Sequence, residues 1–241
     1  MASKSLPPVK ELFQIFQALA GQDEKLSLTR SFHGLSVKQS AAVTRVEDGK
    51  IFLKVSSCPL QNSPDGPICI QHSRITHLVR GSFHLDNGRT GAGVLSDVSW
   101  IGRKWKNRTR DRVQPKSTVF VEIKYKNQSL RGKLDDISTS GMAMLVNQTL
   151  NPTTNLDCHK NVMLSFKLAP ECKFKTLIGT IVYLQPAGSR LIRLGIKFIP
   201  YSEELACLET YISTRKAEIL AELDQTYQDS DTRSQVANLY F

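Results

Sequence analysis

Short segments in which apolar and polar residues alternate recur along most of the chain, and turn-forming residues separate them. Val119, Val121, Ile123 and Tyr125, for example, recur at every second position, and charged residues separate the last three. Successive side chains of a β-strand point to opposite faces of a sheet, so this alternation predicts strands with one buried face. The segments follow one another without the helices that a parallel βαβ arrangement requires. We therefore expect a mainly β fold built from antiparallel strands.

The first half of the chain predicts a leading helix followed by about six strands. Apolar residues recur at helical spacing over residues 9–20, and Gly21 ends this helix. The Asp-Gly pair at residues 48–49 and the Asp-Asn-Gly sequence at residues 86–88 are hairpin signals between apolar runs. Residues 1–99 are expected to form a small antiparallel barrel or split barrel with a leading helix.

The second half predicts another antiparallel barrel, followed by a helix. Its last strand-like segment stops at Pro200, and a serine N-cap followed by two glutamates, residues 202–204, starts the helix. Residues 116–227 are expected to form a six-stranded antiparallel β-barrel with this C-terminal helix. A polar tail, residues 228–241, follows, and its last residues are similar to part of a protease-site tag.

Positive charge is concentrated between the two halves. Residues 103–116 hold seven basic residues and a single acid, Asp111, a net charge of +6 out of the formal +10 of the chain. The stretch has no apolar period and is expected to be a linker, residues 100–115. The repulsion between so many positive charges raises the free energy of the chain unless a bound anion neutralises part of the charge.

The segment Asp136-Ile137-Ser138-Thr139-Ser140-Gly141 ends one of the predicted strands. An aspartate and a serine two positions apart, ahead of a glycine, place hydrogen-bonding groups on a tight β-turn. A carboxylate and a hydroxyl suit the edge of a guanine base, while guanidinium groups suit phosphates and stack on base faces. The two stretches together predict a site for an anionic guanine nucleotide.

Arg108-x-x-x-Arg112 followed by Asp136-x-Ser138-x-x-Gly141 resembles the paired signature of PilZ domains, which are receptors for the bacterial second messenger cyclic di-GMP. The resemblance extends from the basic stretch to the C-terminal helix. The order of the parts is also similar to that of YcgR-type proteins, in which an N-terminal β domain precedes the PilZ barrel.

The resemblance implies a role for each residue of the signature. Arg108 and Arg112 would clasp the phosphates of cyclic di-GMP and stack on guanine. Asp136 and Ser138 would hydrogen-bond the guanine edge, and Gly141 would let the turn close.

Three neighbouring residues extend the predicted site. Arg110 stands between the two arginines of the signature and either helps to bind the ligand or is solvated. Asn107 occupies a position where many PilZ domains carry another arginine, which leaves open whether one or two ligand molecules bind. Asp135 is expected to point to the opposite face of its strand from Asp136.

No catalytic or metal-binding pattern accompanies the signature. The sequence lacks GxSxG, HExxH and GxxxxGK[ST], and hydrolysis of cyclic di-GMP would need a metal-binding cluster. Cys69, His72 and His77 come nearest to one, but they lie in a stretch that predicts strand and turn. The five cysteines are scattered, without a CxxC pair, and are expected to be reduced thiols or core residues. We therefore expect a receptor without a metal, not an enzyme.

The alternative class is a basic β-barrel that binds nucleic acid, because the sequence pI is about 9.4. Such a protein would bind long polyanions with a steep salt dependence and without a preference for guanine. The positive charge is instead focused on one stretch, and the sequence has no helix-turn-helix, zinc-finger or RNP pattern. A small anionic ligand fits better, so nucleic acid is not the expected partner.

The sequence lacks the ~20-residue apolar run that spans a bilayer and the core of a signal peptide, so a cytoplasmic protein is expected. The apolar face of the C-terminal helix, which Arg215 and Lys216 interrupt, suits docking on the barrel or pairing of two chains, so a homodimer stays open. Because the basic stretch also joins the two halves, ligand binding is expected to reorient them and to regulate a protein partner. By resemblance this partner is the flagellar motor or other effector machinery, in motility or biofilm control.

Overall fold

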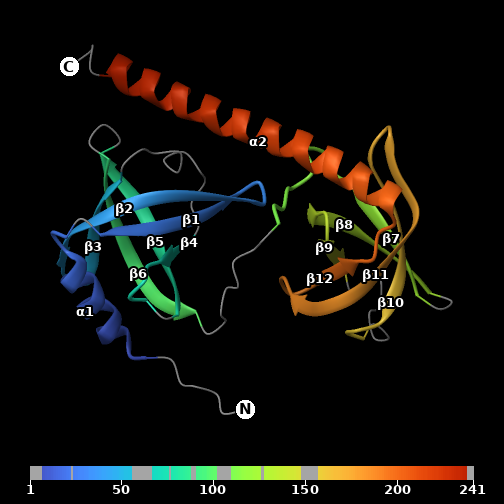
Figure 1. Ribbon diagram of the computed structural model, residues 1–241, viewed down its shortest axis with the longest axis horizontal. Coiled ribbons are helices and arrows are strands. Elements are labelled where there is room, and N and C mark those ends of the chain that lie inside the picture. Colours follow the sequence, from blue (N-terminus) through green and yellow to red (C-terminus); the bar gives the residue numbers. More distant parts are fainter. Residues whose placement is uncertain are drawn as a thin grey trace. The chain divides into compact units, whose positions relative to one another are not determined.

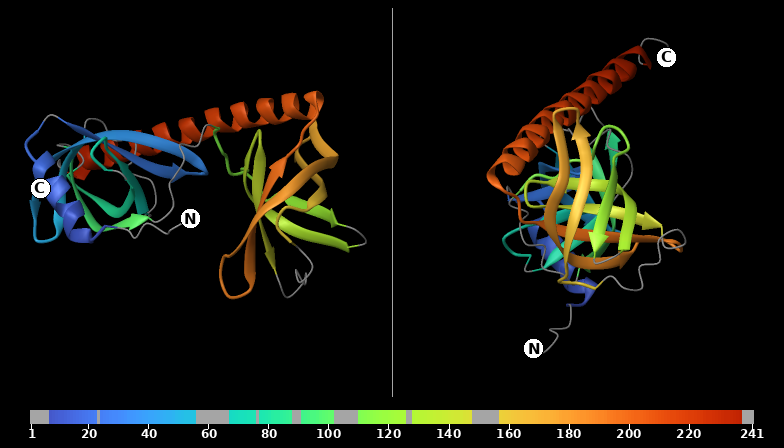
Figure 2. Two further views of the ribbon diagram at one scale, coloured as in Figure 1. Left: turned by 60° about the horizontal axis from the view of Figure 1, so that its bottom comes forward. Right: turned by 90° about the vertical axis from the view of Figure 1, so that its right-hand side faces the viewer.

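The computed structural model describes residues 7–22, 24–55, 67–75, 77–87, 91–101, 110–125, 128–147 and 157–237 (Figure 1). The chain divides into two compact units. The first comprises Met1–Phe32, Ser36–Arg108 and Leu220–Phe241, and the second comprises His33–Leu35 and Thr109–Ile219. Each contains a closed barrel of six strands, which can be followed in Figures 1 and 2. The expected mainly β fold with two antiparallel barrels is confirmed.

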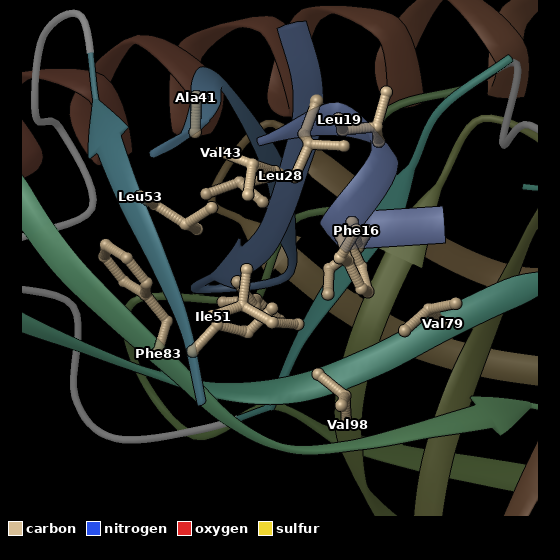
Figure 3. Packing of buried hydrophobic residues seen from close by; sticks show 14 of the residues in the cluster. Phe16, Leu19, Leu28, Ala41, Val43, Ile51, Leu53, Val79, Phe83 and Val98 are labelled. Carbon is tan, nitrogen blue, oxygen red and sulfur yellow. The ribbon is translucent and has the colours of Figure 1, made fainter. Parts of the chain in front are cut away.

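The first barrel has its strands in the spatial order β1-β2-β3-β6-β5-β4. Its elements are α1 (Val9–Leu19), β1 (Lys25–Phe32), β2 (Leu35–Glu47), β3 (Lys50–Val55), β4 (Pro67–Gln71), β5 (Leu78–Asn87) and β6 (Ala92–Ile101). The helix and the barrel interior share one hydrophobic cluster, in which Phe16 and Leu19 of α1 lie with Leu28 and Val79 of the strands (Figure 3). The barrel is therefore closed and not split, and the leading helix contributes to its core.

The expected hairpin turn at Asp48-Gly49 is present between β2 and β3. Both residues have positive φ angles, 49° and 71°, as the central residues of a type I′ turn require. His33-Gly34 joins β1 to β2 with a similar pair, 45° and 82°, a turn that the sequence interpretation missed. Of the second expected signal, residues 86 and 87 belong to β5, and Gly88 lies outside the described residues.

The second barrel has its strands in the spatial order β10-β11-β12-β9-β8-β7. Its elements are β7 (Phe120–Tyr125), β8 (Gln128–Ser138), β9 (Gly141–Asn147), β10 (Asn161–Ala169), β11 (Cys172–Pro186) and β12 (Leu191–Phe198), followed by α2 (Ser202–Ala237). The expected six-stranded barrel with a C-terminal helix is confirmed. The helix extends further than the polar composition after residue 225 suggested, because no glycine or proline ends it before Ala237. In the described part of the chain, no helix combines the length and the apolar character needed to cross a membrane.

The first turn of α2 is capped by a glutamate and not by the expected serine. Glu204 Oε2 accepts a hydrogen bond from the backbone N–H of Tyr201 at 2.9 Å. The carbonyl of Tyr201 accepts the N–H of Leu205 at 2.9 Å. Tyr201 therefore stands at the N-cap, and Glu204, at position N3, makes the bond that the acidic residue of a capping box makes.

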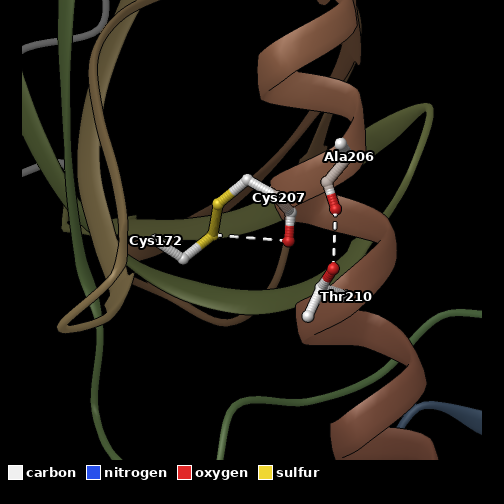
Figure 4. Close-up of a disulfide and its surroundings, with 4 residues drawn as sticks. All are labelled: Cys172, Ala206, Cys207 and Thr210. Carbon is white, nitrogen blue, oxygen red and sulfur yellow. Dashed lines mark hydrogen bonds between the residues drawn. A yellow bond between two sulfur atoms is a disulfide. The ribbon is translucent and has the colours of Figure 1, made fainter.

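A disulfide joins the start of β11 to the second turn of α2 (Figure 4). The Cα atoms of Cys172 and Cys207 are 5.8 Å apart, and the two residues are separated by 35 positions. The expectation that all five cysteines are free was wrong for this pair, because the end of the β10–β11 hairpin lies against α2. Cys69 and Cys158 do not take part in a disulfide, and Cys58 lies outside the described residues.

Candidate ligand-binding site

The arginine segment, residues 110–114, belongs to the described part of the basic stretch and lies along the end of β8. The N–H of Val113 donates to the carbonyl of Ile137 at 2.9 Å, and the N–H of Ile137 donates to the carbonyl of Val113 at 3.0 Å. Val113 is fully buried. These two bonds form an antiparallel bridge, which fixes the segment beside the motif turn, residues 136–141.

Arg112 and Asp136, which belong to the two halves of the predicted signature, are in direct contact. Nη1 of Arg112 donates to Oδ1 of Asp136 at 2.6 Å, with 9% of the Asp136 side chain exposed and 28% of the Arg112 side chain. A charge-assisted hydrogen bond at this depth is stronger than an exposed pair, because little water screens the charges. The contact holds a guanidinium group at the motif turn.

A second arginine, Arg193 of β12, binds the other oxygen of Asp136. Nη2 of Arg193 donates to Oδ2 of Asp136. Its Nε donates to Asp135 Oδ2 at 2.7 Å, and its Nη1 donates to the hydroxyl of Tyr183 at 3.2 Å. Burial lowers the pKa of Arg193, but its hydrogen bond to Asp135 and the charges around it outweigh that effect and raise the pKa above its usual value. Arg193 is therefore a permanent cation beneath the motif turn.

The motif turn itself is held by the hydroxyl of Ser138, which is 1% exposed. Oγ of Ser138 donates to the carbonyl of Gly141 at 3.1 Å and accepts the N–H of Ser140 at 3.4 Å. Serine side chains commonly make such local bonds to the backbone. Arg110, whose side chain is exposed, reaches the same turn, where its Nη1 donates to Oγ1 of Thr139 at 3.1 Å.

Gly141 is required by the close approach of two strands. A Cβ atom at this position would lie 2.3 Å from the carbonyl oxygen of Ile196, because β9 pairs with β12 here. The φ angle of Gly141 is not in the left-handed region. The glycine thus serves backbone packing, and the role in closing the turn that the sequence interpretation assigned to it stays a prediction.

The second barrel and the arginine segment match a known family. The match covers residues 106–213, and the family is the PilZ domain. This part of the chain is a PilZ domain. No curated protein matches the chain in sequence.

Three solved structures are similar over most of the chain. YcgR of Escherichia coli in complex with cyclic di-GMP is 14% identical, with 89% of this chain and 93% of that chain covered and a TM-score of 0.46. The inhibitor of motility MotI/DgrA of Bacillus subtilis is 12% identical, with 81% and 96% covered and a TM-score of 0.42. MrkH of K. pneumonia in complex with cyclic di-GMP is 12% identical, with 88% and 96% covered and a TM-score of 0.48.

Most of the predicted site residues come together at the motif turn of the PilZ domain. The residues that the structure places there are Arg110, Arg112, Asp136, Ser138 and Gly141. The two others, Asn107 and Arg108, lie outside the described residues.

Asp135 departs from the expected alternation of side chains. It was expected on the opposite face of β8 from Asp136, yet both carboxylates bind Arg193. The register between β8 and β9 shifts between Leu134 and Asp136, which makes Asp135 the extra residue of a β-bulge. A bulge interrupts the two-residue period of a strand, so the two carboxylates reach the same guanidinium group.

Arg193 was missed by the sequence interpretation, although one signal was present. It stands between Ile192 and Leu194 in a strand whose only other charged residue is Lys197, and a charge between apolar neighbours needs a partner. The sequence does not identify that partner, because Asp136 lies on another strand, 57 residues earlier.

Proposed function

We propose that the PilZ domain binds cyclic di-GMP at the arginine segment and the motif turn, and that the protein is a receptor for this dinucleotide. The contact between Arg112 and Asp136 supports the proposal most directly, because it joins the two halves of the signature across 24 positions of sequence. The ligand would thus meet both halves at one place.

Arg112 has groups left for a phosphate. Among the described residues its side chain makes one hydrogen bond, through Nη1, so its other N–H groups can bind an anion. A planar guanidinium group suits phosphate and also stacks on a base face. Arg110 adds a second, exposed cation at the same turn, and two cations suit a ligand with two phosphates.

Asp136 is the group that would distinguish guanine. Arg112 and Arg193 each occupy one of its oxygens, but a carboxylate oxygen carries two lone pairs and can accept a further bond. The adjacent N–H donors of a guanine edge would supply that bond, whereas an adenine edge does not offer the same pair. Arg193 would hold the carboxylate in the orientation that this contact needs.

We infer that the ligand is bound and not hydrolysed. Support comes from the sequence, which has none of the nucleophile, metalloprotease or phosphate-loop patterns of the common hydrolases. In the described ranges, no group of three or more His, Cys, Asp or Glu is placed to hold a metal ion. His72, one of the three residues considered for such a site, has its Nε2 3.1 Å from Oε2 of Glu24.

A competition experiment tests this function. Cyclic di-GMP, cyclic di-AMP and duplex DNA are compared as ligands, and the dinucleotide is recovered afterwards and analysed by chromatography. We expect a preference for cyclic di-GMP and intact recovered ligand. A preference for DNA that falls steeply between about 50 and 200 mM salt would favour the nucleic-acid-binding class. Steady conversion to the linear dinucleotide would indicate an enzyme.

Ligand binding is expected to reorient the two domains and so to regulate a protein partner. The net charge of +6 in the basic stretch repels itself in the free protein, and a dianionic ligand cancels part of it. The ligand can shift the domain equilibrium only by its difference in affinity for the two arrangements, for which a coupling of about 1–3 kcal/mol is typical.

Small-angle X-ray scattering of the free and the saturated protein measures this change, and we expect different profiles. Identical profiles at saturation would mean that the receptor binds without switching. The regulated partner, the flagellar motor or other effector machinery, stays a prediction, as does a homodimer.

A further inference from the structure

Two cations interrupt the apolar face of α2 and have no part in the signature. Leu208, Ile212 and Ile219 of this face are buried, and Arg215 and Lys216 stand between them. The Arg215 side chain is only 6% exposed. A charged side chain is rarely buried so far unless it has hydrogen-bonding or charged partners. We therefore expect Arg215 to have such partners.

Both cations bind the arginine segment. Nε of Arg215 donates to the backbone carbonyl of Gln114 at 3.0 Å. Nζ of Lys216 donates to Oδ2 of Asp111 at 2.6 Å. These two bonds contact the chain immediately before Arg112 and two residues after it.

The arginine segment is therefore held from two sides. Arg110 and Arg112 reach the motif turn, at Thr139 and Asp136, while Asp111 between them reaches α2. Alternate side chains of an extended chain point in opposite directions, which explains how one short segment contacts both. A ligand that engages Arg112 acts on a segment whose other face is attached to the helix.

We propose that Arg215 and Lys216 are positioning residues of the ligand site, which hold the arginine segment in the extended form that presents Arg112 and thereby couple α2 to ligand occupancy. The proposal rests on the proposed function. A segment that is already ordered loses less freedom when the ligand binds, so the hold on the segment raises affinity.

Replacing Asp111 by asparagine distinguishes the positioning role from a purely electrostatic effect, because the two predict opposite changes in the affinity for cyclic di-GMP. Removing a negative charge beside an anion site should strengthen binding of a dianion if charge alone matters. The positioning role predicts the opposite, since the bond to Lys216 is lost. We expect Asp111→Asn to weaken cyclic di-GMP binding about two- to fivefold, a range that fits an exposed ion pair. Asp157→Asn, which removes an exposed acid before β10, is the matched control and should not weaken binding.

Two further variants test the contact itself. Lys216→Met should weaken binding to the same degree, and combining it with Asp111→Asn should add little, because both remove one bond. The charge-swapped pair Asp111→Lys with Lys216→Asp should restore most of the affinity. Hydrogen exchange supplies a second readout: ligand should protect the amides of residues 213–219 in the unaltered protein and less so in Lys216→Met.

The outcomes distinguish the two inferences. If the unaltered protein does not bind cyclic di-GMP, the proposed function is wrong. Binding by the unaltered protein, together with equal or tighter binding by Asp111→Asn, overturns the positioning role alone. Weaker binding by Asp111→Asn and rescue by the charge swap support it.

Discussion

Replacing Arg112 with alanine is expected to weaken cyclic di-GMP binding by about ten- to hundredfold. The variant loses a charge-assisted contact to phosphate, worth roughly 1.5–3 kcal/mol. It also leaves Oδ1 of Asp136 without its cation, and this carboxylate then repels the incoming dianion. The fold should persist, because the second oxygen of Asp136 remains bound to Arg193.

Arg190→Ala is the matched control for this result. Arg190 is exposed in the connection between β11 and β12, so its removal changes the net charge equally without touching the motif turn. Circular dichroism establishes that both variants are folded. If Arg112→Ala binds as tightly as Arg190→Ala, the ligand site lies elsewhere in the molecule.

Ser138→Ala should have a smaller effect than Arg112→Ala in the same titrations. The hydroxyl of Ser138 makes neutral hydrogen bonds within the motif turn, and a neutral bond contributes on the order of 1 kcal/mol. The loss is therefore about fivefold in affinity, through a turn that is less well ordered.

Reduction of the disulfide is expected to lower the stability of the PilZ domain by about 3–4 kcal/mol. In the chain-entropy model, a cross-link between residues 35 positions apart removes this much freedom from the unfolded chain. The cross-link attaches α2 to the β10–β11 hairpin, so α2 should loosen first. For a domain of this size the melting temperature should fall by roughly 10–15 °C.

Thermal unfolding with and without a dithiol reductant measures this effect. Both cysteines line a cavity of about 490 Å³, which gives a small reductant access to the bond. The double variant Cys172→Ser with Cys207→Ser should melt like the reduced protein, and Cys158→Ser, which removes a free thiol, should melt like the oxidised one. Equal melting temperatures for the two serine variants would contradict the stabilising role.

The elements and the ligand motif could be predicted because they are local in sequence. Alternation marks each strand, and Asp48-Gly49 marks its hairpin. Of the signature residues, Arg112 precedes β7 and Asp136 lies near the end of β8. Family resemblance then assigned them to one site, and the structure places them in contact.

The missed features all depend on pairing between distant segments. Arg193 reaches Asp136 only because β12 returns beside β9, and Cys172 meets Cys207 only because α2 packs beside a hairpin tip. Asp135 lies on the same face of β8 as Asp136 because of a β-bulge, which the alternation of apolar and polar residues does not reveal. The periodicity of a strand or a helix does not identify the partner of a single charged side chain.

The two cations of α2 show the same limit in a different form. The sequence indicated that Arg215 and Lys216 interrupt an apolar face, which is a local observation. Their partners in the arginine segment lie about a hundred positions earlier, at separations of 101 and 105 residues. The sequence thus shows where charged residues interrupt the apolar face of a helix, but only the structure shows which groups they bind.

A calorimetric titration of cyclic di-GMP into the unaltered protein measures whether the protein is a receptor for this dinucleotide. We expect saturable binding with one or two ligand molecules per chain. Binding of cyclic di-AMP should be at least about tenfold weaker, because adenine does not offer Asp136 the N–H donors of the guanine edge. Absence of binding, or equal affinity for the two dinucleotides, would contradict the proposed function.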